Sequence, residues 1–135
     1  MPARRRIIGK PDLVAEQLST SLKAIQREAQ FSLIISYVRA ANNILPEYLL
    51  GPSRGSQHLS QARHVVYYLS HVGFGMSYTH IGQMTTRDRT SVAHGVTRLE
   101  DGRDAPELDR AMHFAELALA ELFATSWKAS NDSGE

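Results

Sequence analysis

The sequence predicts an all-α fold, and three observations indicate it. Apolar residues recur at intervals of three and four along most of the 135 residues, which is the helical period. Alternation of β-branched with polar residues, the mark of half-buried strands, is scarce. Gly, Pro and Asn fall between the periodic segments, where turns are expected. The composition, 42% hydrophobic and 21% charged, is that of a globular chain that can form one core.

The first half of the chain predicts a long helical region followed by a loop. Pro11 opens a helix. The apolar stripe of this helix comprises Leu18, Leu22, Ile25 and Ala29. A second apolar helical stretch spans 31–44, either continuous with the first or separate from it, and Pro46 starts a short helical turn. Residues 51–60 (GPSRGSQHLS) are expected to form a loop with Arg54 at its centre.

The second half predicts four more helical segments. A helix covers about 61–72, Ser77 caps a short helix, another helix covers about 88–100, and Pro106 begins the last. Residues 131–135 are expected to form a disordered polar tail. The predicted core-facing residues are Ala62, Val65, Val66, Leu69, Val72, Tyr78, Ile81, Met84, Val92, Val96, Leu99, Leu108, Met112, Ala115, Leu119 and Leu122.

The short helix, tight turn and second helix between residues 77 and 99 are typical of a helix-turn-helix. In that motif the second helix enters the DNA major groove. If Val92, Val96 and Leu99 face the core, the helical period places a polar set on the opposite side. This set comprises Arg87, Thr90, His94, Thr97 and Arg98. The competing interpretation is a two-helix corner with a purely structural role, because any surface helix has a polar outer face.

Charge is distributed unevenly along the chain. The net charge is +1, but residues 1–99 carry +7 and residues 100–135 carry −6. This asymmetry predicts a body that faces a polyanion and an acidic C-terminal helix that faces away or contacts a protein partner. Solvated helix faces of chance composition are the alternative. The basic arm, Arg4–Arg6, can follow phosphates or the minor groove, or it can be a disordered end.

Residues 61–99 resemble the C-terminal DNA-binding domain of the bacterial replication initiator DnaA. That family has S-L-x-x-I-G followed by G-R-D-H-T-T-V-x-H-A, and this chain has SYTHIG at 77–82 and RDRTSVAHG at 87–95. The likeness covers about 31–122. It implies a helix-turn-helix bundle, as in the Trp repressor and DnaA, with extra N- and C-terminal helices. The expected segments are a basic arm and helix (1–30), the DNA-binding domain (31–123) and a polar C-terminal tail (124–135).

The resemblance and the polar helix face together imply a role for each polar residue. Residues expected to read bases in the major groove are Asp88, Arg89, Thr90, Ser91 and His94. Residues expected to contact phosphate or the minor groove are Arg54, Arg63, Arg87, Thr97 and Arg98, with Arg54 in the minor groove. Two departures from the family matter. Arg89 replaces a His, which favours guanine as a target, and Thr85–Thr86 replace glycines of the turn, which makes a left-handed conformation there costly.

Other function classes lack support in the sequence. The absence of cysteine excludes disulfides, thiolate metal sites and a cysteine nucleophile, and fits a reducing cytoplasm. The six histidines have no metal-ligand spacing, and no nucleophile elbow or phosphate-binding glycine loop is present. No apolar run has the length of a membrane span, and no secretory signal follows the basic N-terminus. We therefore expect no enzyme activity, cofactor, metal or membrane anchor.

The sequence predicts a sequence-specific double-stranded DNA-binding protein, most simply a bacterial transcriptional regulator in the cytoplasm, associated with the nucleoid. The chain has no ATPase motif, so it is expected to act without the ATPase module of the initiators. The alternative is an adaptor or replication-associated factor that keeps the fold and competes at initiator sites or binds a protein partner. One of the two terminal apolar stripes (18–29 and 108–122) is expected to pack within the chain, and the other is left open to homodimer formation.

Overall fold

The computed structural model describes residues 9–52 and 55–133, with side chains described over 14–52 and 55–124. The elements in chain order are α1 (Gly9–Asn42), α2 (Pro46–Leu49), α3 (Gln57–Tyr68), the π-helical turn η1 (Leu69–Gly73), α4 (Tyr78–Thr85), α5 (Arg89–Gly102) and α6 (Pro106–Ser133). Every regular element in this described part is helical, which confirms the predicted all-α class. Over the same residues, no helix combines the length and the apolar character that a membrane span requires.

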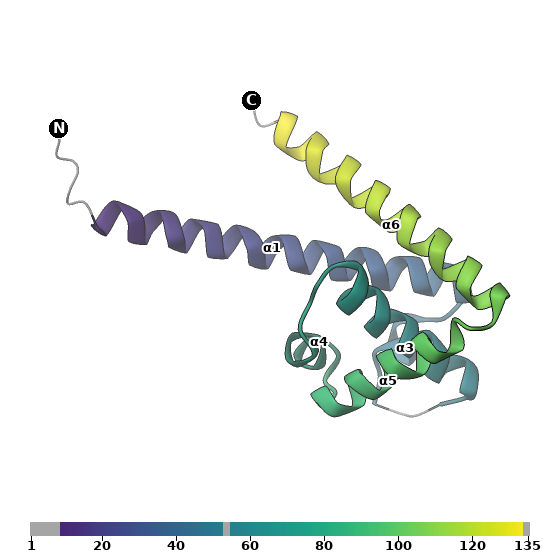
Figure 1. The fold of residues 1–135 in the computed structure, drawn as a ribbon. Helices are drawn as coiled ribbons and strands as arrows, with labels where there is room; N and C mark the ends of the chain where they lie inside the picture. The colour runs from purple at the N-terminus through teal and green to yellow at the C-terminus, as the bar shows by residue number, and fades with distance from the viewer. Residues whose placement is uncertain (1–8, 53–54, 134–135) are drawn as a thin grey trace.

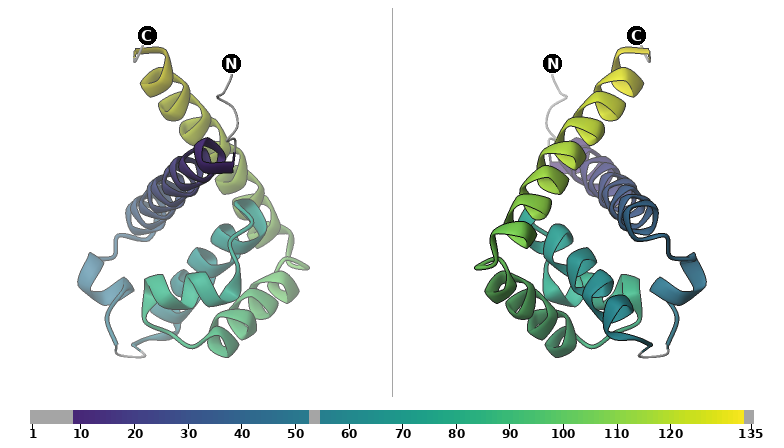
Figure 2. Two further views of the ribbon diagram at one scale, coloured as in Figure 1. Left: turned by 90° about the vertical axis from the view of Figure 1, so that its left-hand side faces the viewer. Right: turned by 90° about the vertical axis from the view of Figure 1, so that its right-hand side faces the viewer.

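Two long helices flank a group of short ones. Helices α2 to α5 cluster against the C-terminal half of α1, and α6 returns from the end of α5 across α1 (Figure 1). In both views of Figure 2 the outer parts of α1 and α6 extend away from this cluster on the same side. The helix-turn-helix therefore lies at the end of the molecule opposite the two termini.

Helix α1 settles the alternative that the sequence left open, because residues 9–42 form one continuous helix. No glycine or proline interrupts the segment between Pro11 and Asn42. The helix ends where Asn43 takes a left-handed conformation with φ of 54°, which asparagine tolerates better than most residues. The Ile44 amide then donates to the Arg39 carbonyl at 3.1 Å and closes the end.

Two predicted boundaries are wrong. Helix α3 begins at Gln57 instead of about residue 61, because the Ser56 hydroxyl oxygen accepts a hydrogen bond from the Leu59 amide at 3.2 Å and Leu59 is buried. Helix α6 continues to Ser133, so the expected disordered tail at 131–135 is helical through 133. The sequence has no glycine or proline between Pro106 and Gly134 that would end this helix earlier.

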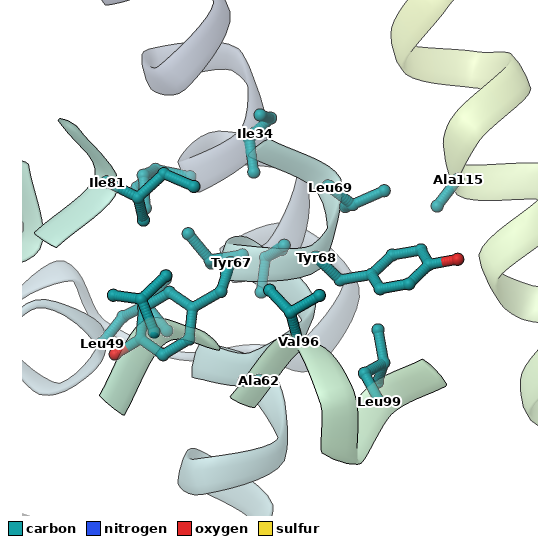
Figure 3. Packing of buried hydrophobic residues seen from close by; sticks show 14 of the residues in the cluster. Ile34, Leu49, Ala62, Tyr67, Tyr68, Leu69, Ile81, Val96, Leu99 and Ala115 are labelled. Carbon is teal, nitrogen blue, oxygen red and sulfur yellow. The ribbon is translucent and has the colours of Figure 1, made fainter. Parts of the chain in front are cut away.

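The core lies where α1, α3 and α5 meet (Figure 3). The predicted stripe of α5 is confirmed, since Val92, Val96 and Leu99 are all buried. Side chains that contribute to the core from the other elements include Ile34, Val38, Leu49, Val66, Leu69, Ile81, Met112, Ala115 and Leu119. Two predicted core positions at the ends of their stripes, Val72 and Leu122, are each 49% exposed and lie outside the core.

Arg103 connects the end of α5 to α6 and α3. Its guanidinium donates to the Asp109 carboxylate at 2.8 Å, to the Glu116 carboxylate at 3.1 Å and to the Tyr68 hydroxyl oxygen at 3.0 Å. Burial of the guanidinium opposes its charge, but these hydrogen bonds outweigh burial and raise the pKa of Arg103. Two of the acids in the acidic C-terminal part thus hold α6 against the body.

We predict that Arg103→Ala lowers the free energy of unfolding by about 2 kcal/mol, because three acceptors in a partly buried site lose their charged donor. Chemical denaturation followed by circular dichroism measures the change. Arg110→Ala, at an exposed position on α6, is the matched control and is expected to stay within about 0.5 kcal/mol of the parent protein. Equal losses in the two variants would contradict this role for Arg103.

Candidate nucleic-acid interface

The turn between α4 and α5 has the geometry of a helix-turn-helix. The Ser77 hydroxyl oxygen caps α4 by accepting from the His80 amide at 3.1 Å, as predicted. At the end of α4 the Arg87 amide donates to the Gly82 carbonyl at 2.8 Å. A Cβ atom at Gly82 would lie 2.5 Å from the Arg87 carbonyl oxygen, so only glycine permits this close turn.

Thr86 adopts the left-handed conformation in this turn, with φ of 57° and ψ of 43°. The sequence predicted that threonines in place of glycines would make such a conformation costly, and the structure places a β-branched residue in it. The expected cost is about 1–2 kcal/mol. The turn is therefore strained and is held by the packing of the helices on either side.

Asp88 begins the second helix of the motif. One of its carboxylate oxygens accepts a hydrogen bond from the Thr90 amide at 2.8 Å, so the side chain caps α5 while remaining exposed. This arrangement places Arg89, the first residue of α5, at the helix N-terminus and in solvent. Base reading by Asp88 stays a prediction, since the cap occupies one carboxylate oxygen and leaves the other.

The outer face of α5 is open. Its exposed polar residues up to Arg98 are Arg89, Thr90, Ser91, His94, Thr97 and Arg98. The opposite side, with Val92, Gly95 and Val96, packs against the body. No described part of either terminal helix covers this face, as the position of α5 in Figure 1 illustrates. The residues predicted to read bases therefore share one accessible surface, and the acids on this side of the helix are Asp88 at its N-terminus and the exposed Asp101 near its C-terminal end.

Two arginines converge on the loop that follows α2. The Arg63 guanidinium donates to the carbonyl oxygens of Leu49, Tyr48 and Gly51, at 2.9, 2.6 and 3.1 Å. The Arg87 guanidinium donates to the Gly51 carbonyl at 2.7 Å and, more weakly, to the Pro52 carbonyl at 3.4 Å. The Gly51 carbonyl thus joins α3 to the start of the α5 region.

This position changes how Arg63 is interpreted. The side chain is only 7% exposed, and its donors satisfy carbonyls at the end of α2. Burial, followed by the positive charge of Arg87, lowers its pKa. Direct contact of Arg63 with phosphate stays a prediction, and a role in fixing the loop is the observed one. Arg54, predicted for the minor groove, lies outside the described residues, as do Arg4–Arg6.

A groove of about 610 Å³ runs between α3 and α5. Its lining residues are Pro52, Ser60, Arg63, His64, Tyr67, Arg87, Thr90, Ser91 and His94. The two helices approach closely because Gly95 has no side chain. A Cβ atom there would lie 2.7 Å from ring atoms of both His64 and Tyr67. Arg98 lines a second depression, together with His64 and Gln61.

His64 lies between these two depressions and was not among the predicted site residues. Its burial, with the positive charge of Arg98 and the neighbouring His94, lowers the pKa of His64. The ring is therefore neutral near pH 7. A bound polyanion would act in the opposite direction, because negative charge favours the protonated ring.

Some of these features could have been found in the sequence. Arg63 lies within the apolar stripe of α3, between Leu59 and Val66, and that position indicates burial. The pairing of His64 with Gly95 has no such signal, because the two residues are 31 positions apart and meet only through the packing of α3 on α5. The predicted residues Arg87, Thr90, Ser91 and His94 are brought together in one groove, whereas Arg89 and Thr97 are not among its lining.

In a comparison with protein families, the model described as the bacterial dnaA protein helix-turn-helix matches residues 31–99. The match begins in the second half of α1 and ends in α5, so it contains α2, α3, α4 and the outer face described above. No curated protein and no solved structure matches the chain.

We predict that Thr86→Gly raises the free energy of unfolding by about 1 kcal/mol. Relief of left-handed strain exceeds the entropy that a glycine costs. Thr97→Gly is the control, since that position is helical and exposed, and it should lower the free energy of unfolding by about 0.3–0.5 kcal/mol. Thermal and denaturant unfolding measure both. Destabilisation by Thr86→Gly would show that the turn is not strained.

Proposed function

The chain belongs to the family of bacterial DnaA helix-turn-helix domains, a DNA-binding family, and from this premise we propose that it binds double-stranded DNA sequence-specifically, with α5 in the major groove. The observation that carries the proposal is the open outer face of α5. A helix reads base edges only if its polar side is accessible over several turns and its apolar side holds it on a scaffold. The exposed residues between Arg89 and Arg98 and the buried stripe from Val92 to Leu99 meet both conditions.

Within this proposal the side chains divide into two groups. Arg89, Thr90, Ser91 and His94, with Asp88 at the cap, read bases. Arg87, Thr97 and Arg98 contact the sugar-phosphate backbone, and Arg63 acts on it directly or through the loop that it fixes. Exposure supports the first group. In the second group, Arg63 and Arg87 line the cationic groove between α3 and α5, and Thr97 and Arg98 are exposed on α5. The Arg54 loop is assigned to the adjacent minor groove, on the family resemblance.

A regulator of transcription is the simplest biological role for such a protein, and it would act on the chromosome in the bacterial cytoplasm. Selection of duplexes from a random pool, read at two salt concentrations, tests the proposal and supplies the site. We expect enrichment of a defined motif that persists at the higher salt concentration. Enrichment of no motif at either concentration would refute sequence-specific binding.

We predict that Arg89→Ala and Arg98→Ala change DNA binding in different ways. Loss of a base-reading arginine should cost about 1–3 kcal/mol on the selected site and change the preferred base at one position. Loss of a phosphate-contacting arginine should weaken all duplexes alike and lower the salt slope by about one. Fluorescence anisotropy on cognate and scrambled duplexes measures both. Indistinguishable profiles for the two variants would reject this division of roles.

We predict that DNA affinity rises as the pH falls from about 7.5 to about 6, across the range in which histidine titrates. The pKa of His64 is lowered in the free protein by burial, Arg98 and His94. Phosphate nearby raises it, so binding takes up a proton. The same lowered pKa predicts that the free protein loses stability as the pH falls below about 6.5.

His64→Gln should reduce this pH dependence of binding, whereas His113→Gln, on the exposed surface of α6, should leave it unchanged. Anisotropy titrations at constant ionic strength supply the measurement. A His64→Gln protein with the full pH dependence would exclude His64 from the interface.

A further inference from the structure

The N-terminal half of α1 carries an apolar stripe that nothing in the described structure covers. Val14, Leu18, Leu22 and Ile25 are between 55% and 61% exposed. Figure 1 shows this half of α1 extending past the helix-turn-helix into solvent. Such a run of large aliphatic side chains exposes apolar area on the order of 400 Å², which is the size of patch that marks a binding surface.

This stripe is not an extension of the core stripe of the same helix. In the C-terminal half of α1 the buried side chains are Ile34, Ile35 and Val38. At 3.6 residues per turn, the stripe at 14–25 lies about 150° around the helix from them. A straight helix that packs its C-terminal half on the body therefore turns the outer stripe away from that body. The body cannot cover it.

The spacing of the stripe is that of a helix that pairs with another helix. Ala15, Leu18, Leu22, Ile25 and Ala29 follow one another at intervals of three, four, three and four residues. These are the intervals of a two-helix seam, in which knobs of one helix enter holes of the other. The small alanines lie at the two ends of this run and the large residues lie in its middle, which leaves room for a second helix to approach.

The charges of this segment suit an identical partner. Glu16, Lys23 and Arg27 lie on the side of α1 opposite the stripe, and Glu28 lies about 80° from its centre. The residues that flank the seam are the uncharged Ser19, Ser21 and Gln26 and, on one side near its C-terminal end, Glu28. Two antiparallel copies place their Glu28 side chains at opposite ends of the seam and so meet without bringing like charges together, and a single stripe supplies both halves of a two-fold interface.

We propose that the stripe of α1 from Val14 to Ala29 is the interface at which two copies of this chain form a dimer. Including the flanking residues, such a seam buries on the order of 1,000 Å² in total, at the lower end for specific interfaces. The dimer is thus reversible at moderate concentration. Each copy keeps its helix-turn-helix at the far end from the seam, so the pair presents two DNA-binding faces. This last step rests on the proposed function.

Sedimentation of the full chain without DNA, over about 1–200 μM, tests the dimer. We expect reversible dimerisation of the parent protein, and a dissociation constant raised at least about tenfold by Leu22→Glu, which places two charges in the apolar seam. Thr20→Glu is the matched control, because Thr20 is exposed on the opposite side of α1, and it should dimerise as the parent does. Circular dichroism confirms that both variants fold, since both positions are exposed.

A parent protein that stays monomeric over this range overturns the proposal, and so does a Leu22→Glu protein that dimerises as well as the parent. If the chain is monomeric and Leu22→Glu abolishes its binding to a different protein, the stripe is the site for that protein. That result also overturns the dimer proposal. On selected duplexes, the parent should bind two sites cooperatively, whereas Leu22→Glu binds single sites with unchanged affinity. Failure of every variant to bind DNA would refute the proposed function and leave the sedimentation result intact.

Discussion

The close packing of α5 on α3 is the constraint on which the rest of the structure depends. Gly95 permits it, because any side chain there would collide with His64 and Tyr67. With α5 held by its apolar side, Val92, Val96 and Leu99 are buried and the polar side must face solvent. The strained turn at Thr86 is tolerated for the same reason. Packing on both sides of the turn determines its conformation more strongly than the local preference of threonine.

Cationic side chains serve two purposes in this molecule. Arg63 and Arg87 use their donors on backbone carbonyls around Gly51, and so fix the loop that precedes α3 relative to the start of α5. Arg103 does the same for α6 through Asp109, Glu116 and Tyr68. Arg89 and Arg98 remain exposed on α5. The net charge of +1 therefore does not show that some arginines stabilise the fold while others are exposed to a binding partner.

Much of the fold could be predicted from the sequence, because α4 and α5 obey local rules. Ser77 and Asp88 are good N-caps, and the period of Val92, Val96 and Leu99 sets the faces of α5. Helix boundaries are harder to predict: the Ser56 cap lies within a polar segment typical of a loop, and α6 continues through residues whose composition is typical of a disordered tail. The period of α3 already indicates the burial of Arg63, whereas the position of His64 depends on contacts between distant segments, which periodicity does not reveal. The sequence predicts both apolar segments of α1, but which of them packs on the body depends on tertiary contacts that it does not reveal.

The central claim is that the outer face of α5 meets DNA. Amide NMR of the labelled full chain, titrated with the selected duplex, tests it most directly because each residue reports separately. The account predicts that the largest shift changes occur at residues 88–98 and around Gly51, with α6 beyond Leu119 unaffected. Shift changes confined to α6 or to the outer half of α1, with no change at α5, would contradict this claim.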